Sequence, residues 1–290
     1  MKRRDFIVRT ARGLGAAWIG SHGLAAWASN PAVLSQKYRA SDTVVLGQTG
    51  IKTSRLAMGT GTIGSAHRSN QTALGVKGLS ELLLNGYDQG LRFFDAADTY
   101  GSHPHVAEAL KHVPRNKVTV LTKSWARDPK SMSADLDRFR RELGTDYLDI
   151  CLMHCVTEGD WTERYKGVMD VLSEAKHKGI IRAHGCSCHS IEALRAAAKS
   201  PWVEVDLARI NPIGSHMDAD PKTVVEVLRE MRASGKAVVG MKILGQGDLR
   251  SRQDEALKYA LSLGVLDAFT IGAESKAEQL DLIRGIETAA

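Results

Sequence analysis

The alternation of short apolar runs with longer amphipathic segments, which begins near Val44, is the feature that most limits how this chain can fold. Short apolar runs indicate buried parallel strands, and the amphipathic segments between them indicate the helices that connect such strands. Eight strand–helix units close into a barrel. We therefore predict an α/β fold, a (β/α)8 TIM barrel, with strands at residues 55–58, 93–96, 118–122, 147–153, 181–186, 205–209, 237–241 and 268–271.

Amphipathic helices are expected in the gaps between these runs. Residues 134–143, 223–233 and 256–263 place apolar side chains on one helical face. Each segment is followed within two residues by a glycine, which a helix end accommodates because glycine readily adopts the left-handed backbone conformation. Two short apolar segments around residues 47–50 predict a β-hairpin before the first barrel strand, and we expect this hairpin to close the barrel floor.

The first 28 residues resemble a twin-arginine (Tat) export signal. Arg3 and Arg4 are followed two positions later by Phe6, then by a weakly hydrophobic stretch of small residues and an Ala26-Trp27-Ala28 cleavage motif. The alternative is a basic amphipathic helix, which the glycines of this segment disfavour. We therefore divide the chain into a signal peptide (1–28), a linker (29–42) and a barrel domain (43–290).

This division carries expectations about location and partners. The Tat export machinery is an expected partner, and the cleaved protein is expected in the periplasm without stable membrane insertion. Residues 1–28 hold five basic side chains and one acidic one, a net of +4, so the formal charge of +6 leaves +2 on the remainder. Because that remainder has no basic stripe, no nucleic-acid partner is expected.

Four polar residues fall at the carboxyl ends of three consecutive predicted strands. Asp95 and Tyr100 follow the second strand, Lys123 follows the third and His154 follows the fourth. Reacting groups in a barrel of this type belong at that end, where the connecting loops converge. Taken singly, each of these residues is more simply explained as a helix cap, a packing residue or a structural ion pair. Together, they predict one catalytic pocket.

At these positions the sequence resembles the aldo/keto reductase family. The resemblance rests on residues 94–101, 121–123, 146–154 and 271–275, and it covers roughly residues 43–285. It implies an NADP(H)-dependent oxidoreductase that reversibly reduces the carbonyl of an aldehyde, a ketone or a sugar. The exact carbonyl substrate, a small molecule, is not indicated by the sequence.

The resemblance also implies a role for each catalytic residue. Tyr100 would donate a proton to the carbonyl oxygen, and Lys123 would lower the pKa of Tyr100, because a nearby ammonium favours phenolate. Asp95 would keep Lys123 charged and oriented. His154 would hydrogen-bond the carbonyl oxygen and orient the substrate. Trp125 and His103 are expected beside His154 at the pocket mouth, as substrate-binding residues.

The implied cofactor is NADP, with NAD possible. Ser187, Cys188 and Asn211 would bind the nicotinamide carboxamide, although Cys188 stands where the family usually has asparagine. The loop after the seventh strand would face the pyrophosphate, and Glu274 would repel a 2′-phosphate that Ser275 and Lys276 would attract. The full set of expected cofactor-binding residues is Gly59, Thr60, Ser187, Cys188, Asn211, Lys242, Leu244, Gly245, Glu274, Ser275, Lys276 and Gln279.

Two alternatives come from other functional classes. The cysteines at 151, 155, 186 and 188, with His154 and His189, raise the question of a metal-dependent lyase or isomerase. Their spacing is not a standard ligand pattern, so no metal is expected. The other alternative is a cofactor-binding barrel that acts as a redox sensor or partner subunit.

Overall fold

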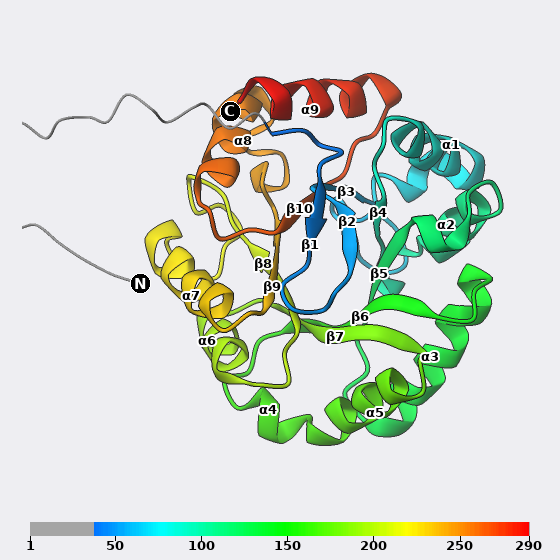
Figure 1. The fold of residues 1–290 in the computed structure, drawn as a ribbon, viewed down its shortest axis with the longest axis vertical. Coiled ribbons are helices and arrows are strands. Elements are labelled where there is room, and N and C mark those ends of the chain that lie inside the picture. The colour runs from blue at the N-terminus through cyan, green and yellow to red at the C-terminus, as the bar shows by residue number, and fades with distance from the viewer. Residues whose placement is uncertain (1–37, 290) are drawn as a thin grey trace, which may run out of the picture. The chain divides into compact units, whose positions relative to one another are not determined.

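Eight parallel strands close into one barrel in the computed structural model, which describes residues 38–289. The strands pair in the order β10-β3-β4-β5-β6-β7-β8-β9. Figure 1 shows the helices arranged around the outside of this barrel. The strands are β3 (Leu56–Gly59), β4 (Phe93–Asp95), β5 (Thr119–Ser124), β6 (Leu148–Val156), β7 (Ile181–Cys188), β8 (Val205–Arg209), β9 (Ala237–Met241) and β10 (Ala268–Ile271).

The helices follow from capping residues and apolar spacing, as α3 illustrates. Asp128 caps its first turn by accepting a hydrogen bond from the Ser131 amide at 2.9 Å, and Gly144 ends it with a φ of 62°. The helices are α1 (Gly75–Asp88), α2 (His103–Leu110), α3 (Pro129–Leu143), α4 (Trp161–Arg164), α5 (Lys166–His177), α6 (Ile191–Lys199), α7 (Pro221–Ala233), α8 (Gln253–Ser262) and α9 (Lys276–Thr288).

Alternate residues of each strand face two separate apolar layers. Phe93, Leu121 and Val239 belong to the cluster that fills the barrel interior. Their neighbours, such as Phe94 and Val120, belong to the larger cluster between the barrel wall and the helices. This period of two decides which strand residues face the barrel interior and which are covered by helices.

A β-hairpin formed by β1 (Thr43–Val45) and β2 (Lys52–Ser54) lies across one end of the barrel, as predicted (Figure 1). Leu46 and Ile51, between the two strands, are fully buried in the cluster that fills the barrel interior. A side chain at Gly47, whose φ is 48°, would lie 2.4 Å from the Ala237 amide nitrogen. This close approach requires glycine.

The prediction of the fold is confirmed, and most strand boundaries agree within two residues. β5 and β6 extend further than expected, so that Lys123 and His154 lie inside strands. Ala40, which we assigned to a linker, is only 1% exposed and accepts a hydrogen bond from the Leu56 amide, because the chain packs on the barrel before β1.

The expected signal, residues 1–28, lies outside the described residues. Within the described part, no helix has the length and apolarity needed to cross a membrane.

Candidate active site

The four predicted catalytic residues meet at the carboxyl end of the barrel. Asp95 ends β4, Lys123 is next to last in β5 and His154 is third from the end of β6. Tyr100 closes a short helical turn, Asp98–Tyr100, that directly follows β4. Since β4, β5 and β6 are neighbours in the barrel, their ends deliver these side chains to one place.

Lys123 is the centre of the group and has no solvent exposure. Its Nζ donates hydrogen bonds to Asp95 Oδ1 at 2.5 Å and to the Ala96 carbonyl at 2.8 Å. The same Nζ lies 4.8 Å from the centroid of the Tyr100 ring. The Tyr100 ring meets the His154 ring edge-on, with 5.6 Å between centroids. A phenol, a cation and an imidazole therefore lie together at the carboxyl end of the barrel.

Burial competes with charge in setting the proton affinities of this group. Burial lowers the pKa of Lys123, but Asp95 and Tyr100 raise it more, so its net pKa lies above the usual 10.5 and the lysine stays charged. Burial raises the pKa of Tyr100 above its usual 10, and the opposing effect of Lys123 is smaller. Lys123 lowers this pKa, as expected, but by less than burial raises it. Lys123 limits a rise that burial causes.

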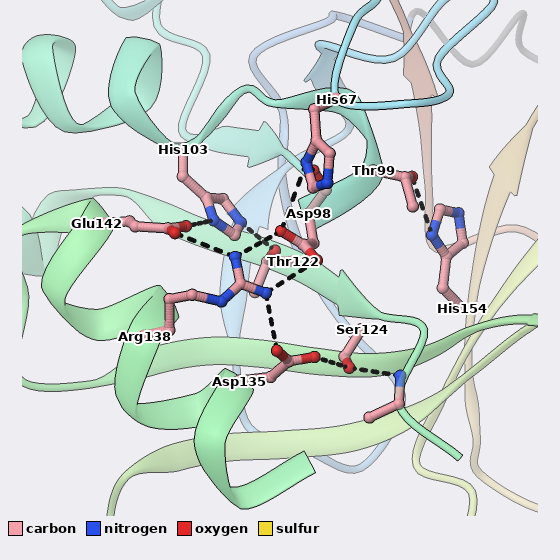
Figure 2. Close-up of polar contacts among 11 residues, drawn as sticks. His67, Asp98, Thr99, His103, Thr122, Ser124, Asp135, Arg138, Glu142 and His154 are labelled. Atoms are coloured by element: carbon pink, nitrogen blue, oxygen red, sulfur yellow. Dashed lines mark hydrogen bonds and ion pairs between the residues drawn. The ribbon is translucent and has the colours of Figure 1, made fainter. Parts of the chain in front are cut away.

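His154 is neutral at physiological pH. Burial, followed by the charge of Lys123, lowers its pKa well below the usual 6.5. The Thr99 hydroxyl lies 3.4 Å from Nδ1 of the ring (Figure 2). When Thr99 donates to Nδ1, the imidazole proton is on Nε2, the nitrogen that can donate to a carbonyl oxygen.

Several residues that support this group were missed by the sequence analysis. The Thr270 hydroxyl donates to Asp95 Oδ2 at 2.9 Å, which occupies the second carboxylate oxygen. The period of two along β10 could have found it, because Ala268 faces the barrel interior and Thr270 is two residues on. A Cβ at Gly61 or Gly64 would lie 2.2 Å or 2.3 Å from the Tyr100 ring, so two glycines let their loop cover the tyrosine.

Beside His154, the barrel wall carries an exposed aromatic ring and a thiol. Trp125 is 49% exposed and its ring lies 5.6 Å from the His154 ring, and its role in substrate binding stays a prediction. Cys155 has a φ of 52°, and its Sγ lies 3.6 Å from His189 Nε2. His103 does not belong to this wall. It is 2% exposed on α2 and directed toward α3, so its assignment as a substrate-binding residue is wrong.

A cavity of about 490 Å³ begins at Asp95 and Tyr100 and runs past the ends of β9 and β10. This volume lies within the usual range for small-molecule sites. Lys242 lines it, with a φ of 58° and its Nζ donating to the neutral Gln246 side chain at 2.6 Å. Burial lowers the pKa of Lys242. Of the expected cofactor-binding residues, four line this cavity: Gly59, Lys242, Leu244 and Glu274.

The three residues expected at the nicotinamide carboxamide are engaged elsewhere. Ser187 Oγ accepts a hydrogen bond from the Cys155 amide at 3.0 Å. Cys188 faces the helices instead of the barrel interior, because it lies one residue further along β7. The side-chain amide of Asn211 donates to the Ser215 and Lys242 carbonyls and accepts from two backbone amides, so it holds its own loop together.

The remaining expected cofactor residues are also outside the cavity lining. Ser275 caps α9 by accepting from the Glu278 amide, and Lys276 is exposed on the next position. Gln279 is buried between helices, where it contacts Asn85 and the Leu82 carbonyl. Thr60 donates to the Asp95 carbonyl, and Gly245 forms a turn with a φ of 55°. None of these residues lines the cavity, so their roles in cofactor binding stay predictions.

The cysteines do not converge on one metal site. Cys186 and Cys188 face the helices with Asp206, whose Oδ1 lies 3.5 Å and 3.4 Å from their sulfurs. Cys155, in contrast, contacts His189. All four cysteines are free thiols. The grouping that suggested a metal-dependent lyase is therefore divided into separate clusters.

Comparison with known proteins identifies the family of this chain. The model of the aldo/keto reductase family matches residues 55–263, which is more than half of the chain. The methylglyoxal reductase DkgB of Salmonella typhi is 31% identical over 112 residues, covering 37% of this chain and 42% of that protein. The NADH-specific methylglyoxal reductase of Escherichia coli is 29% identical over 167 residues, covering 50% of this chain and 51% of that protein. The chain thus spans about half the length of these relatives, or less.

A solved structure supports the same fold. The holo form of an aldo-keto reductase from Bacillus halodurans superposes with a TM-score of 0.70 at 17% sequence identity, covering 86% of this chain and 91% of that one. At this identity the similarity concerns the fold alone. The family match, together with the barrel and its group of four residues, leads to one conclusion: the chain belongs to the aldo/keto reductase family.

Proposed function

We propose that this protein is an NAD(P)H-dependent oxidoreductase that reversibly reduces the carbonyl of an aldehyde, a ketone or a sugar. The observation that carries the proposal is the meeting of Lys123 and His154 with Tyr100, which lines the 490 Å³ cavity. Tyr100 and Asp95 both line the cavity, so a molecule held there lies beside the acid–base group.

The lining of the cavity fits a dinucleotide. Lys242 supplies a cation whose Nζ donates to the neutral side chain of Gln246, which suits a pyrophosphate. Gly59 and Gly272 keep the backbone close to the cavity at the ends of β3 and β10. When bound, the nicotinamide would supply the hydride for the carbonyl carbon.

The chain's own residues account for the proton and for orientation. His154, which is neutral, donates a hydrogen bond from Nε2 to the carbonyl oxygen and directs it toward Tyr100. Tyr100 gives its phenolic proton to that oxygen, and Lys123 stabilises the phenolate left behind. Asp95 balances the buried charge of Lys123. In the reverse direction the phenolate accepts the proton of the alcohol.

Charges at the far end of the cavity bear on the choice of nucleotide. The lining there includes Glu274, Glu278 and Asp281 against one cation, Arg250, a net of −2 (−3 + 1). A 2′-phosphate would meet this net negative charge. The charge count therefore favours NADH, although NADP was the expectation from the sequence.

The proposal is tested by binding and turnover measured separately. We expect quenching of protein fluorescence by NADH or NADPH, and turnover with a panel of aldehydes, ketones and aldoses. In Tyr100→Phe, turnover should fall by about 10²-fold or more while nucleotide affinity is kept. Nucleotide binding without turnover of any carbonyl compound would instead support the redox-sensor alternative.

We also propose export through the Tat pathway, with a periplasmic mature protein. The support is the paired Arg3 and Arg4 with the cleavage motif that ends at Ala28. Release of a folded domain fits this route, because the barrel is complete within the described residues, from β3 to β10.

A further inference from the structure

The outer side of the catalytic group is held by one arginine on α3. Arg138 donates from both terminal nitrogens to Asp98, with distances of 2.7 Å to Oδ1 and 2.9 Å to Oδ2 (Figure 2). Asp98 begins the short turn that ends in Tyr100. A two-point contact between planar groups fixes direction as well as distance. The guanidinium therefore controls how the turn carrying the proton donor sits against α3.

The same guanidinium holds two more carboxylates, both on α3. It lies 2.7 Å from Asp135 Oδ1 and 3.0 Å from Glu142 Oε1. Asp135 accepts from the Ser124 hydroxyl at 2.5 Å. Ser124 is the residue directly after Lys123 in β5 and is fully buried.

Glu142 reaches the other neighbour of Lys123 through a histidine. His103 Nδ1 lies 2.6 Å from Glu142 Oε2, and His103 Nε2 lies 2.7 Å from the hydroxyl of Thr122. Because a carboxylate only accepts, Nδ1 donates to Glu142, and Nε2 is left to bond the Thr122 hydroxyl. Thr122 directly precedes Lys123. Figure 2 shows these contacts as one connected set.

We propose that Arg138 is a positioning residue that sets the separation between Tyr100 and Lys123. It joins the turn of the proton donor, through Asp98, to the residues on both sides of the lysine, through Asp135 and Glu142. Ordinary surface ion pairs contribute little. Here one cation is shared by three carboxylates, so its loss leaves like charges facing one another and releases both segments.

This inference rests on the proposed function only through the roles of Tyr100 and Lys123, and it can be tested without turnover. Arg138→Met removes the contacts, and Arg138→Lys keeps the charge but cannot make the two-point contact with Asp98. Arg141→Met is the matched control, because Arg141 is an exposed arginine on the same helix. The phenol titration of Tyr100 is obtained by ultraviolet absorbance, with Tyr100→Phe as the background.

We expect Arg138→Met to raise the pKa of Tyr100, because the turn moves away from Lys123. The kcat for alcohol oxidation should fall about tenfold, since small displacements of reacting groups reduce rates strongly, while nucleotide affinity stays unchanged. In Arg138→Lys the pKa of Tyr100 should rise by a smaller amount. In Arg141→Met it should equal the wild-type value. Circular dichroism checks folding.

Three results would overturn the proposal. The first is an unchanged pKa of Tyr100 in folded Arg138→Met, and the second is an equal shift of that pKa in Arg141→Met. The third is a wild-type pKa of Tyr100 in Arg138→Lys, which would assign the effect to charge alone. If no carbonyl compound is turned over by the wild type, the proposed function fails, but the titration still decides the role of Arg138. If Arg138→Met does not fold, the Tyr100 titration in Arg138→Lys decides alone. An unchanged pKa of Tyr100 in that variant would overturn the proposal.

Discussion

Lys123 donates a 2.5 Å hydrogen bond to Asp95 in a place where the lysine has no solvent exposure. Removing one partner of a buried pair leaves an uncompensated charge, which commonly costs about 3–5 kcal/mol. We expect Lys123→Met to lower the free energy of unfolding by about this amount and to lower turnover by about 10²-fold or more. The double variant Lys123→Met/Asp95→Leu should regain much of the stability and none of the activity. Urea unfolding and carbonyl turnover measure the two effects, and equal stability of the single and double variants would contradict this account.

The pH dependence of the reaction should follow the pKa values of Tyr100 and His154. Burial raises the pKa of Tyr100 above 10, so the phenol keeps its proton at every pH below about 10. Reduction, which needs that proton, should stay level from about pH 7 to about pH 9 and fall only above pH 10, while alcohol oxidation rises over the same alkaline range. The pKa of His154 lies well below 6.5, so no step is expected near pH 6.5. Initial rates in both directions provide the check, and a step near pH 6.5 that His154→Asn removes would count against a neutral imidazole.

Asp206 should make the protein less stable as the pH rises. It is fully buried, Oδ2 has no hydrogen-bond partner among residues 38–289, and burial raises its pKa from 3.8 to about 7. The unfolded chain therefore loses this proton at lower pH than the folded chain, so stability falls as the pH rises from about 4 to about 7 and is level above that. We expect a loss of about 2–3 kcal/mol between about pH 5 and about pH 8.

Replacing Asp206 with Asn should remove this contribution to the slope. The test compares urea unfolding of both proteins at several pH values, with Asp137→Asn as the control, since Asp137 is an exposed carboxylate on α3. The same slope in the wild type and in Asp206→Asn would show that Asp206 is not the group responsible.

Strand positions were predictable because a buried strand needs a continuous apolar run, and β8, β9 and β10 begin and end where expected. The convergence of Asp95, Tyr100, Lys123 and His154 was predictable because strand ends converge at one end of a barrel. The direction of neighbouring side chains was not. Ser187 and Cys188 are adjacent in β7, so they point to opposite sides of the barrel wall and cannot both reach the same ligand.

Side-chain contacts between helices could not be predicted from the sequence either. His103 begins α2 at the expected end of the barrel, but its ring is turned toward Glu142 on α3. Gln279 follows Glu274 by little more than one helical turn, yet it faces α1 instead of the cavity. Such choices depend on which partner the packed helices bring within reach, and no local pattern encodes this.

Export should depend on the paired arginines. Changing Arg3 and Arg4 to lysine removes the feature that the twin-arginine route recognises, and we expect the protein to remain in the cytoplasm. In the unaltered protein, cleavage after Ala28 should give a mature chain that begins at Ser29. Cell fractionation and mass spectrometry of the exported fraction provide the measurement. An intact Met1 in that fraction would contradict cleavage, and export of the lysine variant would contradict the route.

The choice between NADH and NADPH should respond to one charge at the end of the cavity. Glu274 lines the cavity and is held in place by Asn70, whose Nδ2 donates to Oε1 at 2.8 Å. Glu274→Arg changes the local net charge from −2 to 0 and offers a donor to a 2′-phosphate, so NADPH should bind about tenfold more tightly and NADH should change little. Fluorescence titration with both nucleotides measures this. Lys276→Ala is the matched control on the same segment, and because Lys276 is not part of the lining, neither affinity should change. If Lys276→Ala weakens NADPH selectively while Glu274→Arg has no effect, the 2′ position faces the start of α9, and the charge argument for NADH is wrong.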